Sequence, residues 1–348
     1  MRLLEIADYL KKEKLDAIVL FNKSPGFDYF IGQELEHGLL ILSKTANYLF
    51  ISPLYSPKVP GFKVVQWKTF KKDLESFIKQ HHIKRVGFDA DNILFRQKKF
   101  LSKYFSAKDA SKFLSGIRAK KTTEEVIRIK QACRITDEVF TGIVNGLRKG
   151  EFKEENDIAR FIKISALQND CELSFPPIVA SGGNGVIAHH VPDAKLRKGF
   201  MVLDFGVKYK GYCADMTRTI YLGAPSSAEK QVYEKLRRVQ DYCIQYARVG
   251  MKASKLSKHA KTLLGKDAKY FIHGLGHGIG VEIHELPSVF DKSDDVLEKG
   301  NVFTIEPGYY NKKTRIGIRI EDDILLADNG KKEVLTKSAK SLVCIRFK

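Results

Sequence analysis

The sequence has few cysteines, and none of them forms a C-x-x-C pair. Its five cysteines are scattered along 348 residues and are odd in number, which argues against a disulfide framework and against a thiolate zinc site. No apolar run approaches the length of a membrane span. The N-terminal segment mixes acids with its apolar residues, as an amphipathic helix does. These absences predict reduced thiols, a cytoplasmic location without an export signal, and no membrane partner.

A long block of basic residues is also missing, although the net charge is +19, from 60 basic and 41 acidic residues. Such an excess can attract nucleic acid or an anionic surface. Here the lysines are spread along the whole chain, and neither a zinc finger nor an aromatic-basic RNA-binding signature occurs. We therefore expect a generally basic surface and no specific nucleic-acid partner.

The length and the ordinary balance of apolar and charged residues predict two globular domains. In the first, residues 1–116, an opening helix and a helix at 71–81 alternate with strand patterns at 16–21, 37–42, 48–51 and 85–89. This rhythm indicates an α/β domain, and it contains no tight cluster of metal-type ligands. The second domain is predicted over residues 117–348.

The second domain shows one order of elements twice, two helices followed by strands. The first helix is expected to start at a capping box formed by Thr122 and Glu125 and to run toward Gly150. The remaining helices are expected at 154–168, 228–249 and 253–264. Strands are expected at 178–180, 200–205 and 212–222, and again near 281, at 302–305 and at 316–326. No sequence repeat supports this pattern, so it is one of elements alone.

Two aspartates, Asp204 and Asp215, lie inside apolar strand patterns. A carboxylate at an inward strand position is costly unless something compensates its charge, and a shared cation can do so. In a hairpin the two positions can face each other across the strands. The alternative is that each aspartate faces solvent, and these two residues alone do not decide between the possibilities.

Three of the nine histidines, His273, His277 and His284, fall within twelve residues. Glycines flank His277 on both sides, and glycine lets a backbone approach a site closely. We expect His277 to be a metal ligand and His284 to lie beside it as a supporting or substrate-binding group. The alternative is a glycine-rich turn with incidental histidines.

Two glutamates, Glu306 and Glu321, also lie in or at the end of apolar strand runs, and Arg319 alternates with Glu321. Together with the two aspartates and one imidazole, they suit two hard divalent metal ions. This oxygen-rich set favours Mn²⁺, Co²⁺ or Fe²⁺ over structural zinc. Of the possible ions we expect Mn²⁺, and Co²⁺, Fe²⁺ and Zn²⁺ are the alternatives. Two such ions can activate a water and polarise a carbonyl together.

These four separated motifs occur in one order over residues 117–348, and they resemble the pita-bread metallopeptidases, peptidase family M24. That family includes aminopeptidase P, prolidase, methionine aminopeptidase and creatinase. Residues 1–116 resemble the creatinase-type leader domain, and the segment 317–322 resembles the Xaa-Pro peptidases. The resemblance implies an α/β (α+β) fold, in which a creatinase-type α/β domain precedes a curved antiparallel sheet flanked by helices.

The resemblance also implies roles for individual residues. The metal ligands would be Asp204, Asp215, His277, Glu306 and Glu321. Asp215 and Glu321 would bridge the two ions, and Glu306 would also handle the proton of the bridging hydroxide.

Four further residues would act around the metals. His189 matches a substrate-side histidine that follows the glycine-rich loop, although the adjacent His190 competes for this assignment. His284 would support the scissile carbonyl or the tetrahedral intermediate. His273 lies where proline-specific members carry an additional histidine, and Arg319 would orient carboxylates.

Filled ligand positions argue against the non-catalytic members of the family and against creatinase, which uses no metal. The resemblance therefore predicts a dinuclear metal-dependent Xaa-Pro aminopeptidase that acts on peptides with proline at the second position, and a homodimer. The first alternative is a prolidase, an Xaa-Pro dipeptidase that cleaves only dipeptides. A methionine aminopeptidase and a non-enzymatic binding module without metal are the others.

Overall fold

The computed structural model describes residues 2–32, 35–327 and 329–347. The chain forms two compact units, Met1–Arg118 and Ala119–Lys348. The predicted domain bounds of 1–116 and 117–348 lie beside this division.

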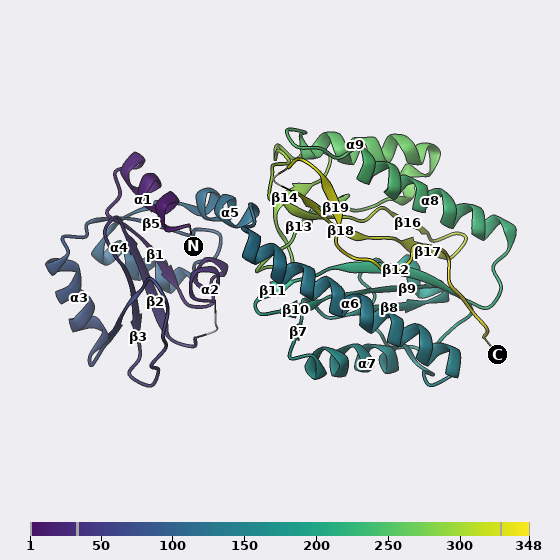
Figure 1. The fold of residues 1–348 in the computed structure, drawn as a ribbon, viewed down its shortest axis with the longest axis horizontal. Coiled ribbons are helices and arrows are strands. Elements are labelled where there is room, and N and C mark those ends of the chain that lie inside the picture. The colour runs from purple at the N-terminus through teal and green to yellow at the C-terminus, as the bar shows by residue number, and fades with distance from the viewer. Residues whose placement is uncertain (1, 33–34, 328, 348) are drawn as a thin grey trace. The chain divides into compact units, whose positions relative to one another are not determined.

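The first unit is a six-stranded sheet in the order β4-β3-β2-β1-β5-β6 (Figure 1). Its strands are β1 (Ala17–Phe21), β2 (Gly38–Ser43), β3 (Asn47–Ile51), β4 (Lys63–Gln66), β5 (Arg85–Phe88) and β6 (Ser106–Asp109). Its helices are α1 (Leu3–Lys12), α2 (Pro25–Ile31), α3 (Phe70–Gln80), α4 (Phe95–Tyr104) and α5 (Ser111–Ala119). The central strand β1 is buried on both faces and divides two apolar clusters. The predicted α/β arrangement and the strands at 16–21, 37–42, 48–51 and 85–89 are confirmed.

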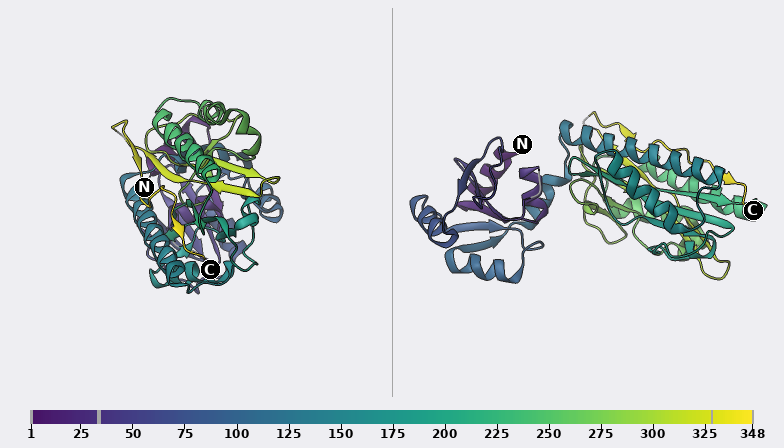
Figure 2. Two further views of the ribbon diagram at one scale, coloured as in Figure 1. Left: turned by 90° about the vertical axis from the view of Figure 1, so that its right-hand side faces the viewer. Right: turned by 90° about the horizontal axis from the view of Figure 1, so that it is seen from below.

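The second unit begins with the predicted capping box. The Oγ1 of Thr122 accepts a hydrogen bond from the Glu125 N–H at 3.3 Å, and the Thr122 N–H donates to Glu125 Oε2 at 2.8 Å. The helix α6 (Thr123–Lys149) then runs to Gly150, whose φ of 72° ends it in the left-handed region. In Figure 2 this helix runs along the outside of the strands.

Three more long helices complete the two predicted pairs. They are α7 (Glu155–Gln168), α8 (Ser227–Tyr246) and α9 (Ala253–Leu264). The pair α6 and α7 packs against the strands of the first half of this unit, whereas α8 and α9 pack against those of the second half (Figure 1). The apolar stripes of all four helices are buried there, which fixes the frame that carries the site.

The strands of the first half are β7 (Glu172–Leu173), β8 (Ile178–Ser181), β9 (Gly199–Phe205), β10 (Val207–Tyr209), β11 (Tyr212–Cys213) and β12 (Met216–Leu222). Those of the second half are β13 (Gly276–Gly278), β14 (Glu285–Val289), β15 (Val302–Ile305), β16 (Gly308–Asn311), β17 (Ile316–Arg319), β18 (Asp322–Leu326), β19 (Lys332–Val334) and β20 (Cys344–Ile345). The two larger sheets have the orders β20-β12-β9-β8 and β14-β13-β15-β18-β19. The smaller ones are β11-β10-β7 and β16-β17. Short helices η1 (Gly182–Val186) and η2 (Gly265–Tyr270) follow β8 and α9.

The predicted pair of strands around residues 208–211 forms with a different register. The strand expected at 212–222 splits into β11 and β12, and Asp204 lies opposite Thr217 instead of Asp215. The reason is a change of sheet at Gly206, where an added Cβ would lie 1.8 Å from the carbonyl oxygen of Ala214. Asp215 therefore lies in the short link between two strands.

Two other strand predictions are wrong. Val281 lies in a bend between β13 and β14, because the chain folds back so tightly that a Cβ on Gly280 would lie 2.3 Å from the Glu285 carboxylate. The run 316–326 breaks into β17 and β18, which pair with β16 and β15 respectively. At that break the N–H of Glu321 donates to the Thr217 carbonyl at 3.1 Å, an interaction that apolar alternation does not reveal.

Candidate active site and metal centre

The two aspartates come from the first half of the second unit, and both are buried. Asp204 is the penultimate residue of β9, and Asp215 directly precedes β12. The backbone N–H of Asp215 donates to Asp323 Oδ2 at 2.9 Å, which holds the link between the strands in place. The sequence-based idea that an inward carboxylate needs compensation therefore applies to both residues.

The imidazole of His277 comes from the second half, on β13. A register shift between His277 and Gly278 marks a β-bulge, which redirects the side chain. Both flanking glycines are needed for packing, because a Cβ on Gly276 would lie 2.0 Å from the Thr304 carbonyl oxygen and one on Gly278 2.1 Å from that of Leu286. The Nδ1 of His277 lies 3.2 Å from the Gly278 carbonyl oxygen, so Nε2 faces the carboxylates.

The two glutamates also come from the second half, each just after a strand. Glu306 follows β15, and its Oε1 lies 3.5 Å from His277 Nε2, which is equally far from Asp215 Oδ2. Glu321 lies between β17 and β18, where Thr217 Oγ1 donates to its Oε2 at 2.6 Å. One imidazole nitrogen is thus shared by carboxylates from both halves of the unit.

One cavity of about 620 Å³ collects every residue that the sequence singled out. Those residues are His189, Asp204, Asp215, His273, His277, His284, Glu306, Arg319 and Glu321. Apolar residues line the cavity as well and include Phe175, Pro176, Pro177 and Phe290. Their individual roles stay predictions, but the geometry places a cluster of ionisable groups beside an apolar surface.

The charges in this cavity strongly affect one another. Burial raises the pKa of Asp215 well above its usual range, and the neighbouring Glu321 and Asp204 raise it further. Burial likewise raises the pKa of Glu321, with Glu306 adding to the effect, and raises the pKa of Glu306 to about 8. Burial lowers the pKa of His277 to about 3. Without a cation the site therefore disfavours ionised carboxylates around a neutral imidazole, and a bound cation would stabilise their charge while the imidazole acts as a ligand.

The donor atoms fit divalent cations. Within the described part of the chain, three buried carboxylate oxygens of the cluster have no hydrogen-bond partner, namely Asp204 Oδ1, Asp215 Oδ1 and Glu321 Oε1. A ligand atom of Asp215, one of His277 and one of Glu321 all lie within 4.8 Å of one another. Buried, unpartnered carboxylate oxygens that repel each other are the environment that a hard cation stabilises.

A second layer of hydrogen bonds holds the carboxylates. Arg319 binds Asp204 through Nη2, lies 3.2 Å from Thr217 Oγ1 through Nε, and donates from Nη1 to the Tyr310 hydroxyl at 2.6 Å. That hydroxyl lies 2.9 Å from His273 Nε2, while His273 Nδ1 lies 2.8 Å from the Gly274 carbonyl oxygen. A tyrosine that accepts from arginine and donates to His273 connects this histidine to a cavity carboxylate.

Tyr310 and Thr217 were missed by reasoning from the sequence, because neither is a metal-type ligand. Burial lowers the pKa of His273 to about 4, so its ring is neutral. A neutral ring can accept a hydrogen bond from the Tyr310 hydroxyl at Nε2. Both ring nitrogens of His273 thus have protein partners in this structure. The sequence leaves open whether His273 binds substrate or supports other residues, and substrate binding would require that one of these partners be exchanged.

We expect Tyr310→Phe to lower kcat/KM by about tenfold, because Arg319 and His273 each lose the partner that orients them. Steady-state kinetics on the metal-loaded variant would measure this. Tyr309→Phe is the matched control, since the Tyr309 hydroxyl contacts Asn311, outside this chain of hydrogen bonds. Equal losses in the two variants would contradict the proposed connection.

The remaining histidines of the cavity differ in their exposure and in their contacts with other side chains. His284 approaches His277 edge-on, with ring centroids 4.3 Å apart. Desolvation lowers the pKa of His284, and the nearby His189 lowers it further. His189 is exposed at the cavity, whereas the adjacent His190 is buried and its Nε2 lies 2.7 Å from Glu155 Oε2. Of the two neighbours, His189 is the one free to meet a substrate.

Comparison with known families agrees with this arrangement. The model of the Creatinase/Prolidase N-terminal domain matches residues 2–120. The model of Metallopeptidase family M24 matches residues 127–328, which is more than half of the chain. The chain belongs to metallopeptidase family M24. As an M24 protein it is a metal-dependent peptidase, and the predicted creatinase-type and pita-bread fold is confirmed.

Relatives of this M24 peptidase extend over nearly its whole length. The Xaa-Pro dipeptidase of Pyrococcus horikoshii is 31% identical over 348 residues, which cover 97% of each chain. The solved structure of the Xaa-Pro dipeptidase from Bacillus anthracis has a TM-score of 0.91 at 28% identity and covers 99% of both chains. The X-Pro aminopeptidase from Thermotoga maritima has a TM-score of 0.89 at 26% identity, covering 97% of this chain and 100% of that one.

Proposed function

We propose that this M24 peptidase is an Xaa-Pro dipeptidase, which hydrolyses the bond before proline in dipeptides. The sequence alone favours an Xaa-Pro aminopeptidase and keeps the dipeptidase as its first alternative. Relatives named Xaa-Pro dipeptidase that match almost end to end support the alternative better. The structural observation behind the proposal is the cavity that joins a carboxylate cluster to an apolar wall, since a pyrrolidine ring is apolar and rigid.

Two divalent ions would be held by five side chains. These are Asp204, Asp215, His277, Glu306 and Glu321. When bound, such ions supply an activated water and an electrophile for the scissile carbonyl. We propose Mn²⁺ as the metal because the set is rich in carboxylate oxygens, with Co²⁺, Fe²⁺ and Zn²⁺ as the alternatives.

Four side chains would have further roles in the reaction. Glu306 accepts a proton from the attacking water and donates it to the nitrogen of the leaving proline, as its position between His277 and His273 allows. His284, as a neutral imidazole, donates a hydrogen bond to the oxygen on which negative charge develops. His189 binds the substrate from the side of the glycine-rich loop. Arg319 keeps Asp204 in its ligating orientation.

One observation favours the aminopeptidase as a second candidate. Among the described residues that line the cavity, Arg319 is the single lysine or arginine, and its guanidinium is engaged by Asp204 and Tyr310. A dipeptidase must bind the free carboxylate of its substrate, whereas an aminopeptidase has no such requirement. In a dipeptidase built on this cavity, His189 would therefore supply the donor for that carboxylate.

The decisive experiment compares Ala-Pro, Ala-Pro-amide and Ala-Pro-Ala as substrates of the Mn²⁺-loaded protein. We expect kcat/KM for the dipeptide to exceed that for the other two by at least about tenfold, because both lack the carboxylate next to the ring. Equal or faster cleavage of the tripeptide and the amide would establish the aminopeptidase instead. Absence of cleavage by folded protein with all four metals would contradict both candidates.

Two properties expected from the sequence stay predictions, a homodimer and a cytoplasmic location. In the described part of the chain, no helix combines the length and the apolar character that crossing a membrane requires. The mass in solution, measured by light scattering, would decide the oligomeric state.

A further inference from the structure

A wholly buried carboxylate lies outside the metal cluster. Glu155 is the first residue of α7, and none of its surface is exposed. A buried carboxylate is costly unless hydrogen bonds satisfy it, although the N-terminus of a helix favours negative charge. The reaction proposed above assigns no task to this residue.

The carboxylate of Glu155 is surrounded by donors from one loop. Its Oε1 accepts from the Ser181 N–H at 2.7 Å, from Ser181 Oγ at 2.9 Å and from Asn184 Nδ2 at 3.0 Å. Its Oε2 lies 2.7 Å from His190 Nε2 and 3.4 Å from each of the backbone nitrogens of Asp193 and Ala194. Burial alone would raise the pKa of Glu155, but the hydrogen bonds from Ser181 and His190 outweigh it and lower the pKa. The group is thus a satisfied, ionised carboxylate.

The loop that Glu155 holds forms one side of the cavity. Residues 181–194 leave β8, pass through η1 and approach β9, and Glu155 binds them near both ends. Between these ends the residues at 189–192 line the cavity, His190 among them, and of the two histidines His189 is the exposed one. None of the five proposed metal ligands belongs to this loop. It therefore contacts the space for the substrate without contributing to the proposed metal centre.

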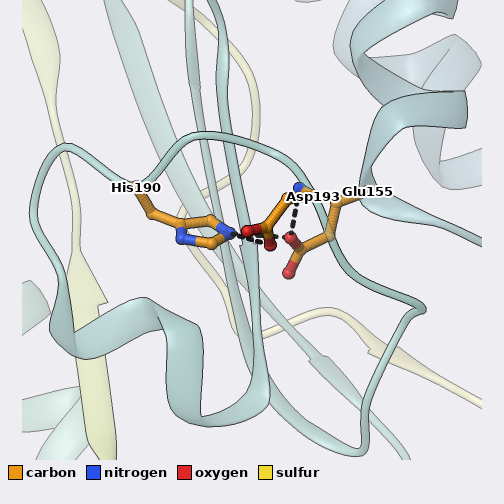
Figure 3. Close-up of side chains that lie close together, drawn as sticks. All are labelled: Glu155, His190 and Asp193. Carbon is orange, nitrogen blue, oxygen red and sulfur yellow. Dashed lines mark hydrogen bonds and ion pairs between the residues drawn. The ribbon is translucent and has the colours of Figure 1, made fainter.

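A metal site at this position fits the observations less well. Ligand atoms of Glu155, His190 and Asp193 do lie within 4.8 Å of one another, and Figure 3 shows the three side chains converging. However, both oxygens of Glu155 already accept protein donors, and 73% of the Asp193 side chain is exposed. The cluster is therefore a hydrogen-bonded anchor whose centre is Glu155.

We propose that Glu155 is a positioning residue, which through His190 and Ser181 fixes the loop that presents His189 to the substrate. The proposal rests on the proposed function for the identity of the substrate, an Xaa-Pro peptide. A loop fixed in advance binds a substrate without a further loss of conformational freedom. Weakening the anchor should therefore act mainly on substrate affinity and leave the metals bound.

The test is Glu155→Gln, which preserves the shape of the side chain but replaces an acceptor oxygen by an N–H₂ group that faces donors. We expect KM for the Xaa-Pro substrate to rise about tenfold or more, with kcat changed by less than about threefold. Metal content should be unchanged. Backbone amides of residues 182–194 should exchange with deuterium faster than in the wild type, and those of β13 should not.

The matched control is Glu154→Gln, because Glu154 is the exposed neighbour at the same end of the helix. Asp193→Asn tests the metal alternative, since a loss of bound metal in that variant would overturn the anchor. If Glu155→Gln changes neither KM nor the hydrogen exchange of residues 182–194, the proposed role of Glu155 is overturned as well. If that variant does not fold, His190→Gln must show the selective rise in KM. Should the wild type cleave no Xaa-Pro peptide, the proposed function fails, and the exchange measurement alone decides whether Glu155 holds the loop.

Discussion

Asp215→Asn should lower kcat/KM by roughly a thousandfold or more and, at the same time, stabilise the metal-free protein. The activity falls because the proposed bridging ligand loses its charge, and a metal centre supplies several kcal/mol of the stabilisation that the transition state requires, roughly 4 kcal/mol for this loss. The stability rises because burial and the charges of Glu321 and Asp204 already oppose ionisation of Asp215. Asparagine has no acidic proton to bind, so the metal-free variant avoids the free-energy cost of neutralising this buried carboxyl near neutral pH.

Two measurements separate these effects. Elemental analysis after exposure to Mn²⁺ should find less than the wild-type amount of metal, and thermal unfolding with a chelator present should show a higher Tm for the variant. Asp294→Asn is the control, because 96% of its side chain is exposed and it lies outside the cavity. Full metal content in Asp215→Asn would remove Asp215 from the proposed ligand set, whereas a lower Tm without metal would contradict the cost assigned to its buried carboxyl.

His284→Gln should lower kcat by about a hundredfold to a thousandfold while metal content stays at the wild-type level. The rate falls because the variant loses one hydrogen-bond donor to the oxygen on which negative charge develops, and this hydrogen bond is fully formed only in the transition state. Desolvation and His189 lower the pKa of His284, so the ring is neutral and its N–H donates without a net charge. Glutamine has a donor of its own, but its flexible side chain does not hold that donor in a fixed position as the rigid ring does.

The control for this prediction is His259→Gln. His259 lies on α9 and stacks on Tyr246 with ring centroids 4.0 Å apart, away from the cavity. Kinetics at saturating substrate, together with metal analysis, would separate a loss in chemistry from a loss of metal. A large rise in KM with unchanged kcat would assign His284 to substrate binding instead.

The cluster of ionisable residues could be chosen from the sequence because charge inside apolar runs is costly. Asp204, Asp215 and Glu321 stand out for that reason, and His277 stands out through its glycine neighbours. The structure explains those glycines, since the Thr304 carbonyl oxygen occupies the space of a Cβ at Gly276. Local composition therefore indicated these four residues, whereas His189 and the individual roles came from the resemblance to the M24 family.

The placement of these residues could not be predicted, because it depends on which strands pair. An expected hairpin puts Asp204 opposite Asp215, whereas the observed register puts it opposite Thr217. The break at Glu321 is equally hard to predict, because an apolar run leads up to the acids at 321–323 and another follows them. Sequence periodicity reports which face of a strand is buried, but it does not report where a strand changes partner.

The supporting residues were missed for a different reason. Tyr310 lies beside another tyrosine in an apolar strand, and Glu155 lies among other acids at the start of a helix. Each has an ordinary local explanation, either packing or favourable charge at a helix end. Their importance arises from contacts with residues such as Arg319 and Ser181, which are distant in sequence.

The proposed ligands come from both halves of the second unit, with Asp204 and Asp215 in the first and His277, Glu306 and Glu321 in the second. Ions held there would link the two halves, each of which has its own pair of helices, and would stabilise their contact. A free metal concentration of 100 times the Kd adds about 2.7 kcal/mol to the free energy of unfolding. The supply of metal would thus affect the stability of the folded enzyme as well as its turnover. A shortage of metal would first weaken the contact between the two halves.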